Sequence, residues 1–171
     1  MARQNEVTAI AQCGCGRVAY HAAGKPIACV ACYCDDCQAG SHQVDALGGA
    51  SPVCGADGGT AYVLYRKDRV ACVRGADLLR DHKLKPESRT VRVTASCCNS
   101  AMVMRFEDSR FWVSMYRTPF AAPPPVQMRI ATKFKPASAS IPADAPSYRG
   151  FPFAFVGTLL RAWVPMLLGR P

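Results

Sequence analysis

The sequence predicts a mainly β fold, and three observations lead to that prediction. Short runs in which apolar and polar residues alternate recur before residue 118, and a period of two is typical of half-buried strands. Turn-forming residues such as Asp57-Gly58-Gly59 and Asn99-Ser100 separate neighbouring runs, which favours antiparallel pairing. Of the segments between the runs, only Asp77–His82 has the pattern of a short helix.

The composition is that of a globular chain. Apolar residues make up 50% and charged residues 19% of the 171 residues, enough to bury the core of one ordinary domain. The predicted strands are Arg17–His21, Thr60–Tyr65, Arg69–Val73, Thr90–Ala95, Ala101–Phe106 and Arg110–Tyr116.

Proline and charge divide the chain after residue 118. Residues 119–152 contain eight of the thirteen prolines, which disrupt helices and central strands, so we expect an extended arm there. Apolar residues then recur at helical spacing, which predicts a helix over 154–168 that is strained at Pro165 or ends there. Residues 109–171 carry eight basic side chains against Asp144, so much of the net charge of +9 lies there. We therefore predict a β domain over 1–118 and a basic extension over 119–171.

The cysteines indicate metal binding. Ten cysteines in a chain without an export signal point to a reducing cytoplasm, where clustered thiols bind metals more often than they form disulfides. Cys13 and Cys15 lie on a glycine-rich turn, and the adjacent Cys97 and Cys98 end a predicted strand. A structural zinc site usually joins two such pairs, so we expect these four residues to hold one zinc ion.

A second group lies at Cys32, Cys34 and Cys37. Three protein ligands leave the fourth zinc position to water or substrate, which is what a catalytic site requires. Spacing alone equally allows Cys29, or the nearby His42, to close this group as a second structural site. Cys54 and Cys72 stand alone and are expected to be small buried residues.

These motifs resemble the glutathione-dependent formaldehyde-activating enzyme (GFA) family, which also contains a centromere protein. The resemblance covers about residues 10–118 and rests on Cys13-Gly14-Cys15-Gly16-Arg17-Val18-Ala19-Tyr20, the triplet Cys32, Cys34 and Cys37, and the later cysteine pair. It implies an Mss4-like fold of coiled antiparallel β-sheets, one structural zinc held by four cysteines and a second zinc held by three.

The chain departs from the family pattern at two places. Cys97-Cys98-Asn99 replaces the usual Cys-x-x-Cys-Gly, and Gln38 follows the triplet where arginine is common. These forms look more like an uncharacterised bacterial subgroup of the family.

The resemblance implies a carbon–sulfur lyase that acts on adducts of a small aldehyde with glutathione or a similar thiol. Asp35 or Asp36 could then move a proton, although the residues favour the simpler interpretation that both are solvated carboxylates of a loop. The alternative function is a non-catalytic, zinc-stabilised binding module whose basic tail meets an acidic partner.

The sequence argues against nucleic acid and membrane as partners. The positive charge and Arg110-Phe111-Trp112 are features of nucleic-acid binding, but alternation directs half of such aromatics into the core and cysteine-bound zinc lowers the net charge, so we expect no nucleic-acid partner. The apolar stretch Phe151–Gly169 contains Arg161 and Pro165, and we expect no transmembrane segment. The C-terminal helix is expected to dock on the β domain or to form a homodimer.

Overall fold

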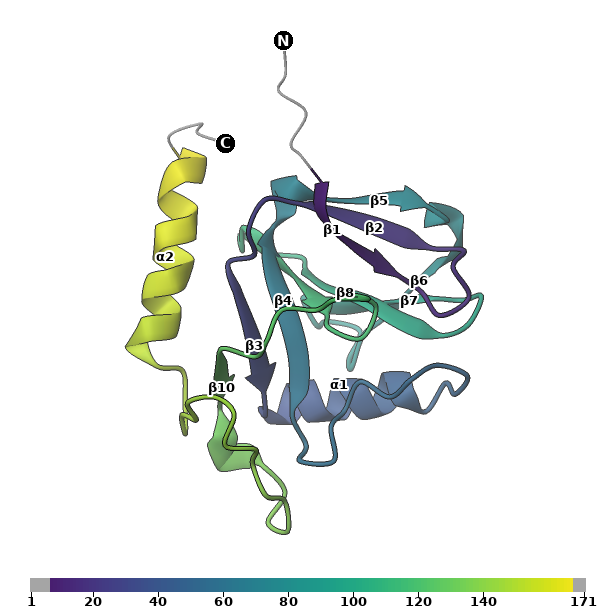
Figure 1. Cartoon of the computed structure of the whole chain (residues 1–171). Coiled ribbons are helices and arrows are strands. Elements are labelled where there is room, and N and C mark those ends of the chain that lie inside the picture. Colours follow the sequence, from purple (N-terminus) through teal and green to yellow (C-terminus); the bar gives the residue numbers. More distant parts are fainter. Residues whose placement is uncertain (1–6, 168–171) are drawn as a thin grey trace.

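Two β-sheets dominate the computed structural model, which describes residues 7–167 of the chain and the side chains of residues 9–166. The mainly β prediction is confirmed (Figure 1). The strands are β1 (Val7–Gln12), β2 (Ala19–Ala23), β3 (Ala28–Cys32), β4 (Thr60–Arg66), β5 (Val70–Arg74), β6 (Leu79–His82), β7 (Thr90–Ala95), β8 (Ser100–Phe106), β9 (Trp112–Tyr116) and β10 (Met128–Ile130). The helices are α1 (Asp35–Asp45) and α2 (Phe153–Leu167), with 3-10 turns at Lys67–Arg69, Ala76–Leu78 and Thr132–Phe134.

The small sheet has the order β1-β2-β5, and the large sheet has the order β10-β3-β4-β9-β8-β7-β6. The runs predicted from alternation lie in β2, β4, β5, β7, β8 and β9 and pair antiparallel, as expected. β10 is the exception, because it lies parallel to β3 at the sheet edge, where a proline-rich flank is tolerated.

The core has two halves, one on each face of the large sheet. On β4, Val63 and Tyr65 pack toward the small sheet, whereas Tyr62 and Leu64 pack toward α1. This alternation follows from the two-residue period of a strand. In β3, the same alternation determines which cysteines face α1.

The helix α1 was not predicted. Its buried residues, Cys37, Gly40, Ser41 and Val44, have helical spacing, but most are small and the apolar pattern is therefore weak. The helix predicted over Asp77–His82 is wrong. The segment forms a 3-10 turn and then β6, because pairing with β7 supplies its backbone hydrogen bonds.

The predicted C-terminal helix is confirmed as α2, although residue 168 lies outside the described residues. Pro165 lies within α2 and does not end it. Several apolar side chains of α2 are exposed, namely Phe153, Val156, Leu160, Trp163 and Val164. Dimerisation through this helix stays a prediction, as does the domain boundary after residue 118.

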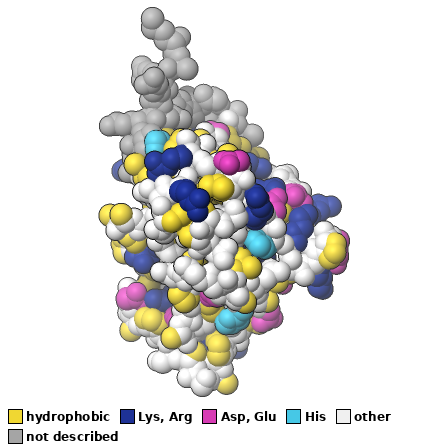
Figure 2. All heavy atoms as spheres, turned by 90° about the vertical axis from the view of Figure 1, so that its right-hand side faces the viewer, with side chains coloured by type: hydrophobic (Ala, Val, Ile, Leu, Met, Phe, Trp, Pro, Cys, Tyr) yellow, Lys and Arg dark blue, Asp and Glu magenta, His cyan; other side chains and the backbone are white. Residues whose placement is uncertain are grey.

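Charges of both signs share the surface. Figure 2 shows Lys and Arg side chains interspersed with Asp, Glu and apolar groups on the face that it displays. The aromatic motif near residue 110 is engaged within the chain, since the guanidinium of Arg110 lies 3.8 Å from the ring centroid of Phe106 and pairs with Asp108. No helix within the described part of the chain is both long and apolar enough to cross a membrane.

Candidate metal centres and the adjoining pocket

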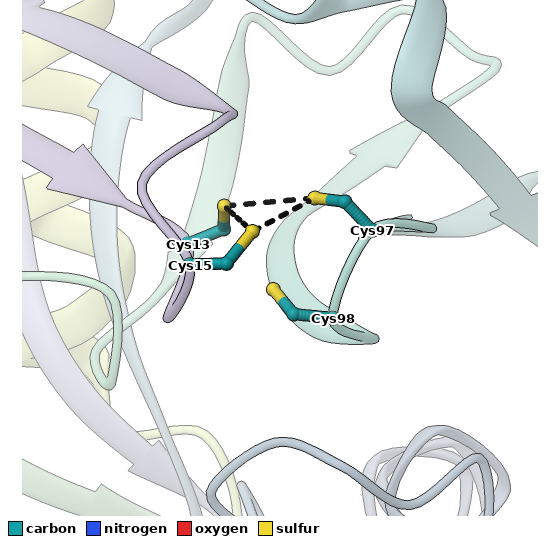
Figure 3. A group of neighbouring side chains, drawn as sticks. All are labelled: Cys13, Cys15, Cys97 and Cys98. Atoms are coloured by element: carbon teal, nitrogen blue, oxygen red, sulfur yellow. Dashed lines mark hydrogen bonds between the residues drawn. The ribbon is translucent and has the colours of Figure 1, made fainter.

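The sulfurs of Cys13, Cys15, Cys97 and Cys98 converge between two loops (Figure 3) and lie within 4.8 Å of one another. The sulfur–sulfur distances are 3.7 Å for Cys13–Cys15, 3.8 Å for Cys13–Cys97 and 3.3 Å for Cys15–Cys97. A tetrahedral zinc with bonds of about 2.3 Å places its sulfurs about 3.8 Å apart. This group could therefore hold one metal ion.

The loop after β1 curls around the first two sulfurs. The amide of Gly16 donates to the carbonyl of Cys13 at 2.9 Å, and the φ of 78° at Gly16 is a conformation that favours glycine. The amide of Val18 donates to the Cys13 sulfur at 3.2 Å. Amide donors of this kind orient and stabilise a thiolate ligand.

A tight turn lets the adjacent Cys97 and Cys98 face one site. Asn99 has a φ of 57°, which asparagine adopts more readily than most residues. Its side-chain amide donates to the carbonyls of Leu47 and Gly48, both at 3.1 Å.

Arg17 places positive charge beside the four-cysteine group. The pKa of Cys15 is lowered to about 6, chiefly because the Arg17 amide donates to its sulfur and then because the guanidinium does. Desolvation, followed by hydrogen bonds with Cys15 and Cys13, raises the pKa of Cys97 to about 12. Metal binding would remove this difference in protonation between Cys15 and Cys97, because every sulfur ligand binds as a thiolate.

The second group forms where β3 runs into α1. Cys32 is the last residue of β3, Cys34 is the N-cap of α1 and Cys37 lies in its first turn. The Cys32 and Cys34 sulfurs are 3.5 Å apart, and the three sulfurs lie within 4.8 Å of one another. They could hold a second metal ion.

Hydrogen bonds make Cys34 the sulfur that ionises first. Thiol donation from Cys32 and then Cys37 lowers the pKa of Cys34 to about 3, with help from the amides of Cys37 and Asp36. The hydrogen bond with Cys34 raises the pKa of Cys32 to about 12, and hydrogen bonds with Cys32 and then Cys34 raise the pKa of Cys37.

The structure separates Cys29 and His42 from the triplet. Cys29 is three residues before Cys32 in the same strand, so it faces the small sheet, and its sulfur meets the carbonyl of Pro124. The Nε2 of His42 lies 3.9 Å from the sulfur of Cys54. Within residues 9–166, no fourth Cys, His, Asp or Glu joins the three sulfurs at this spacing.

Cys54 and Cys72, expected to be buried, are partly exposed.

Arg92 is a buried cation that sequence reasoning missed. Its side chain is 1% exposed, and Nη2 donates to the carbonyl of Asp36, while Nε and Nη1 have no hydrogen-bond partner among the described residues. A buried charge of this kind requires a compensating charge nearby. Zinc held by three thiolates carries a net charge of about −1, which fits this requirement.

All three cysteines of the triplet line one pocket of about 200 Å³. Asp36 and Arg92 also line it and are joined by the hydrogen bond from Arg92 to the Asp36 carbonyl, while Arg110 lines it beside Phe106. Asp35 and Asp36 are exposed residues of a helix, not of a loop as one alternative held. The remaining walls come from β3, β4, β7, β8, β9, β10 and α2, and from the segments just before β9 and α2.

Comparisons with known proteins leave the family open. No protein-family model and no curated protein match the sequence. Among solved structures, the chain is similar to a Rhodobacter sphaeroides protein determined as a structural-genomics target, at 12% identity and a TM-score of 0.48. That match covers 68% of this chain and 91% of the other. Membership of the formaldehyde-activating family stays a prediction.

Proposed function

We propose that the protein is a two-zinc enzyme, a carbon–sulfur lyase that acts on adducts of a small aldehyde with glutathione or a similar thiol. In the direction of synthesis, the thiol S–H adds across the aldehyde C=O, so that a C–S bond and an O–H bond form. In the reverse direction, the C–S bond breaks and the thiol and the aldehyde are released.

The observation that supports this proposal best is that the three-cysteine group opens onto a pocket. All of its members line the same cavity, whereas a closed structural site needs no space for a reactant. Zinc held by three thiolates would supply a fourth position at which an incoming thiol loses its proton near neutral pH.

The surrounding residues have distinct roles in this proposal. Cys32, Cys34 and Cys37 hold the metal, and the amides at the start of α1 stabilise the Cys34 thiolate. Arg92 balances the negative charge of the group. Asp36 is exposed and lines the pocket, and in this proposal its carboxylate accepts the proton that the thiol loses. The group formed by Cys13, Cys15, Cys97 and Cys98 holds the structural zinc.

Elemental analysis and calorimetry test the proposal. We expect the purified wild-type protein to carry two zinc ions per chain and the Cys34→Ser variant to lose one, with the fold kept by the four-cysteine group. Titration with glutathione should release or absorb heat with the wild type and not with Cys34→Ser. The matched control is Cys72→Ser, which removes a thiol outside both groups and should leave zinc content and heat unchanged.

X-ray absorption at the zinc edge counts the sulfur ligands of each zinc and can therefore contradict the proposal. Four sulfur ligands at both zincs, together with no heat from glutathione or cysteine, would contradict an open site. The non-catalytic binding module with a basic tail would then be the better description.

A further inference from the structure

We propose that the pocket beside Cys32, Cys34 and Cys37 selects thiols and thiol adducts whose sulfur carries an apolar, ring-sized substituent. This inference rests on the proposed function, because it assumes that the sulfur of the ligand occupies the fourth position at the metal. It adds the class of substrate to that function.

The walls of the pocket are mostly apolar away from the cysteines, with Thr90, Ser114 and Arg110 as polar exceptions. Side chains from both ends of the sequence contribute to them, so the cavity exists only in the folded chain. These walls are formed mainly by Val30, Leu64, Met104, Phe106, Trp112, Ile130, Phe151 and Phe155. Such a lining favours hydrocarbon over a hydrated polar group, since transfer of apolar surface out of water is favourable.

The size of the pocket suits one ring. Its volume is about 200 Å³, and an apolar cavity of about 150 Å³ is enough to bind benzene. Formaldehyde alone would leave most of this space unfilled. A drug-sized ligand, in contrast, needs a pocket of roughly 300 Å³ or more.

The aromatic wall is held in place before a ligand binds. Phe106 and Trp112 meet edge to face, with ring centroids 5.8 Å apart and an interplanar angle of 64°. The guanidinium of Arg110 lies over the ring of Phe106 as a cation–π partner and is paired with Asp108. A wall fixed in this way loses little conformational entropy on binding.

The cations at the pocket do not provide a seat for a substrate carboxylate. Nε and Nη1 of Arg92 are fully enclosed, and a Cβ at Gly40 would lie only 1.7 Å from Nε, so α1 covers the guanidinium. Arg110 is already paired with Asp108. An anionic group inside this pocket would therefore lose hydration without gaining an accessible cation, so the carboxylates of a thiol such as glutathione would have to lie outside it.

The experiment compares two thiol probes, phenylmethanethiol and 2-mercaptoethanol, on the zinc-loaded full-length protein by calorimetry. We expect phenylmethanethiol to bind at least about tenfold more tightly, as burial of a ring predicts. Trp112→Ala should reduce that preference to less than about threefold while leaving the affinity for 2-mercaptoethanol unchanged. Zinc content measured after each titration checks that the thiols have not removed the metal.

Two further variants keep the test decisive. Trp163→Ala removes an aromatic side chain that does not line the pocket, and it should keep the full preference. If Trp112→Ala does not fold, Phe155→Ala removes a different part of the wall and should weaken the preference in the same direction. Equal affinities of the wild type for the two probes would overturn the inference and leave the proposed function standing. Binding of neither probe, together with no heat from glutathione, would overturn the proposed function itself, whereas heat from glutathione alone would overturn only this inference.

Discussion

Arg129 in β10 donates a hydrogen bond to the hydroxyl of Tyr33, with 2.6 Å between Nη1 and Oη. Tyr33 stands between Cys32 and Cys34, so this contact joins the proline-rich arm to the three-cysteine group. Arg129 also pairs with Asp57 at 3.2 Å and with Asp144 at 2.8 Å. The guanidinium is therefore the centre of a network that links three separate parts of the chain.

Replacement of Arg129 should destabilise the fold. Arg129→Met leaves Asp57 and Tyr33 without their cation, and we expect the free energy of unfolding to fall by about 2–4 kcal/mol. Urea unfolding followed by circular dichroism measures this loss. Arg149→Met is the control, since Arg149 is an exposed residue of the same arm. Equal stability of the two variants would contradict a central role for Arg129.

Acid should weaken the part of the network that contains Asp144. Hydrogen bonding to Arg129 lowers the pKa of Asp144 below its ordinary value of 3.8. A lowered carboxyl pKa stabilises the fold above the ordinary value, and the stabilisation is lost as the pH falls through the folded-state pKa. The stability difference between wild type and Asp144→Asn should therefore be constant from pH 7 to about 5 and shrink below about pH 4.

Urea unfolding of wild type and Asp144→Asn at each pH measures this difference and cancels effects that both proteins share. The control is Asp77→Asn, a change at an exposed carboxyl. A difference between wild type and Asp144→Asn that grows toward low pH would have the wrong sign for the predicted contact.

Loss of the four-cysteine group should unfold the β body. Cys13 and Cys15 tie the start of the chain to the turn after β7, so the free energy of metal binding there becomes free energy of folding. We expect Cys13→Ser to abolish cooperative thermal unfolding and to lose zinc from this group. Cys72→Ser is the control. Melting of Cys13→Ser like that of the wild type would show that this group is not structural.

Gly40 offers a test of how closely α1 covers Arg92. In an exposed helix, Gly→Ala stabilises by about 1 kcal/mol. At Gly40 the added Cβ would lie 1.7 Å from Nε of Arg92, so we expect Gly40→Ala to destabilise instead and to lower the zinc content of the triplet. Gly157→Ala in α2 is the control, because nothing lies within 4 Å of its added Cβ. A stabilising effect at both positions would contradict the packing.

Truncation tests the predicted boundary between residues 118 and 119. A chain ending at Thr118 should fold and keep the four-cysteine zinc if 1–118 is a domain, but with a lower unfolding midpoint because β10 and Arg129 are absent. A chain ending at Gly150 keeps both and removes only α2 and the residues around it. If the full chain dimerises through α2, light scattering should give the chain that ends at Gly150 the mass of a monomer. Recovery of the shorter chain only as metal-free aggregate would show that the arm belongs to the β body.

Pattern and spacing made part of the fold predictable. In strands such as β4 and β7, polar and apolar residues alternate with a period of two and turn residues lie nearby. Their ranges could therefore be predicted from the alternation. β3 was missed because its sequence, Ala-Cys-Val-Ala-Cys, has no polar residue that could alternate with the apolar ones. β10 was missed because its pairing is long-range and follows a run of prolines.

The grouping of the cysteines was more predictable than their surroundings. Short spacing brings Cys32, Cys34 and Cys37 together locally, and paired motifs at the ends of predicted strands suggested the other group. Only the strand geometry separates Cys29 from the triplet, because residues three apart in β3 face opposite sides of the sheet. Arg92 gave no signal, since a basic residue in an alternating strand is usually exposed. Zinc ligation by both groups stays a prediction.

Phe155 belongs to α2 and is 8% exposed, yet it lines the pocket beside the triplet. The terminal helix thus supplies a wall of the pocket while contributing none of the seven cysteines of the two groups. Mutations in this helix can change which ligands fit without touching the metal ligands. Under the proposed function, ligand preference can therefore change through this helix while the cysteines that would carry the chemistry stay the same.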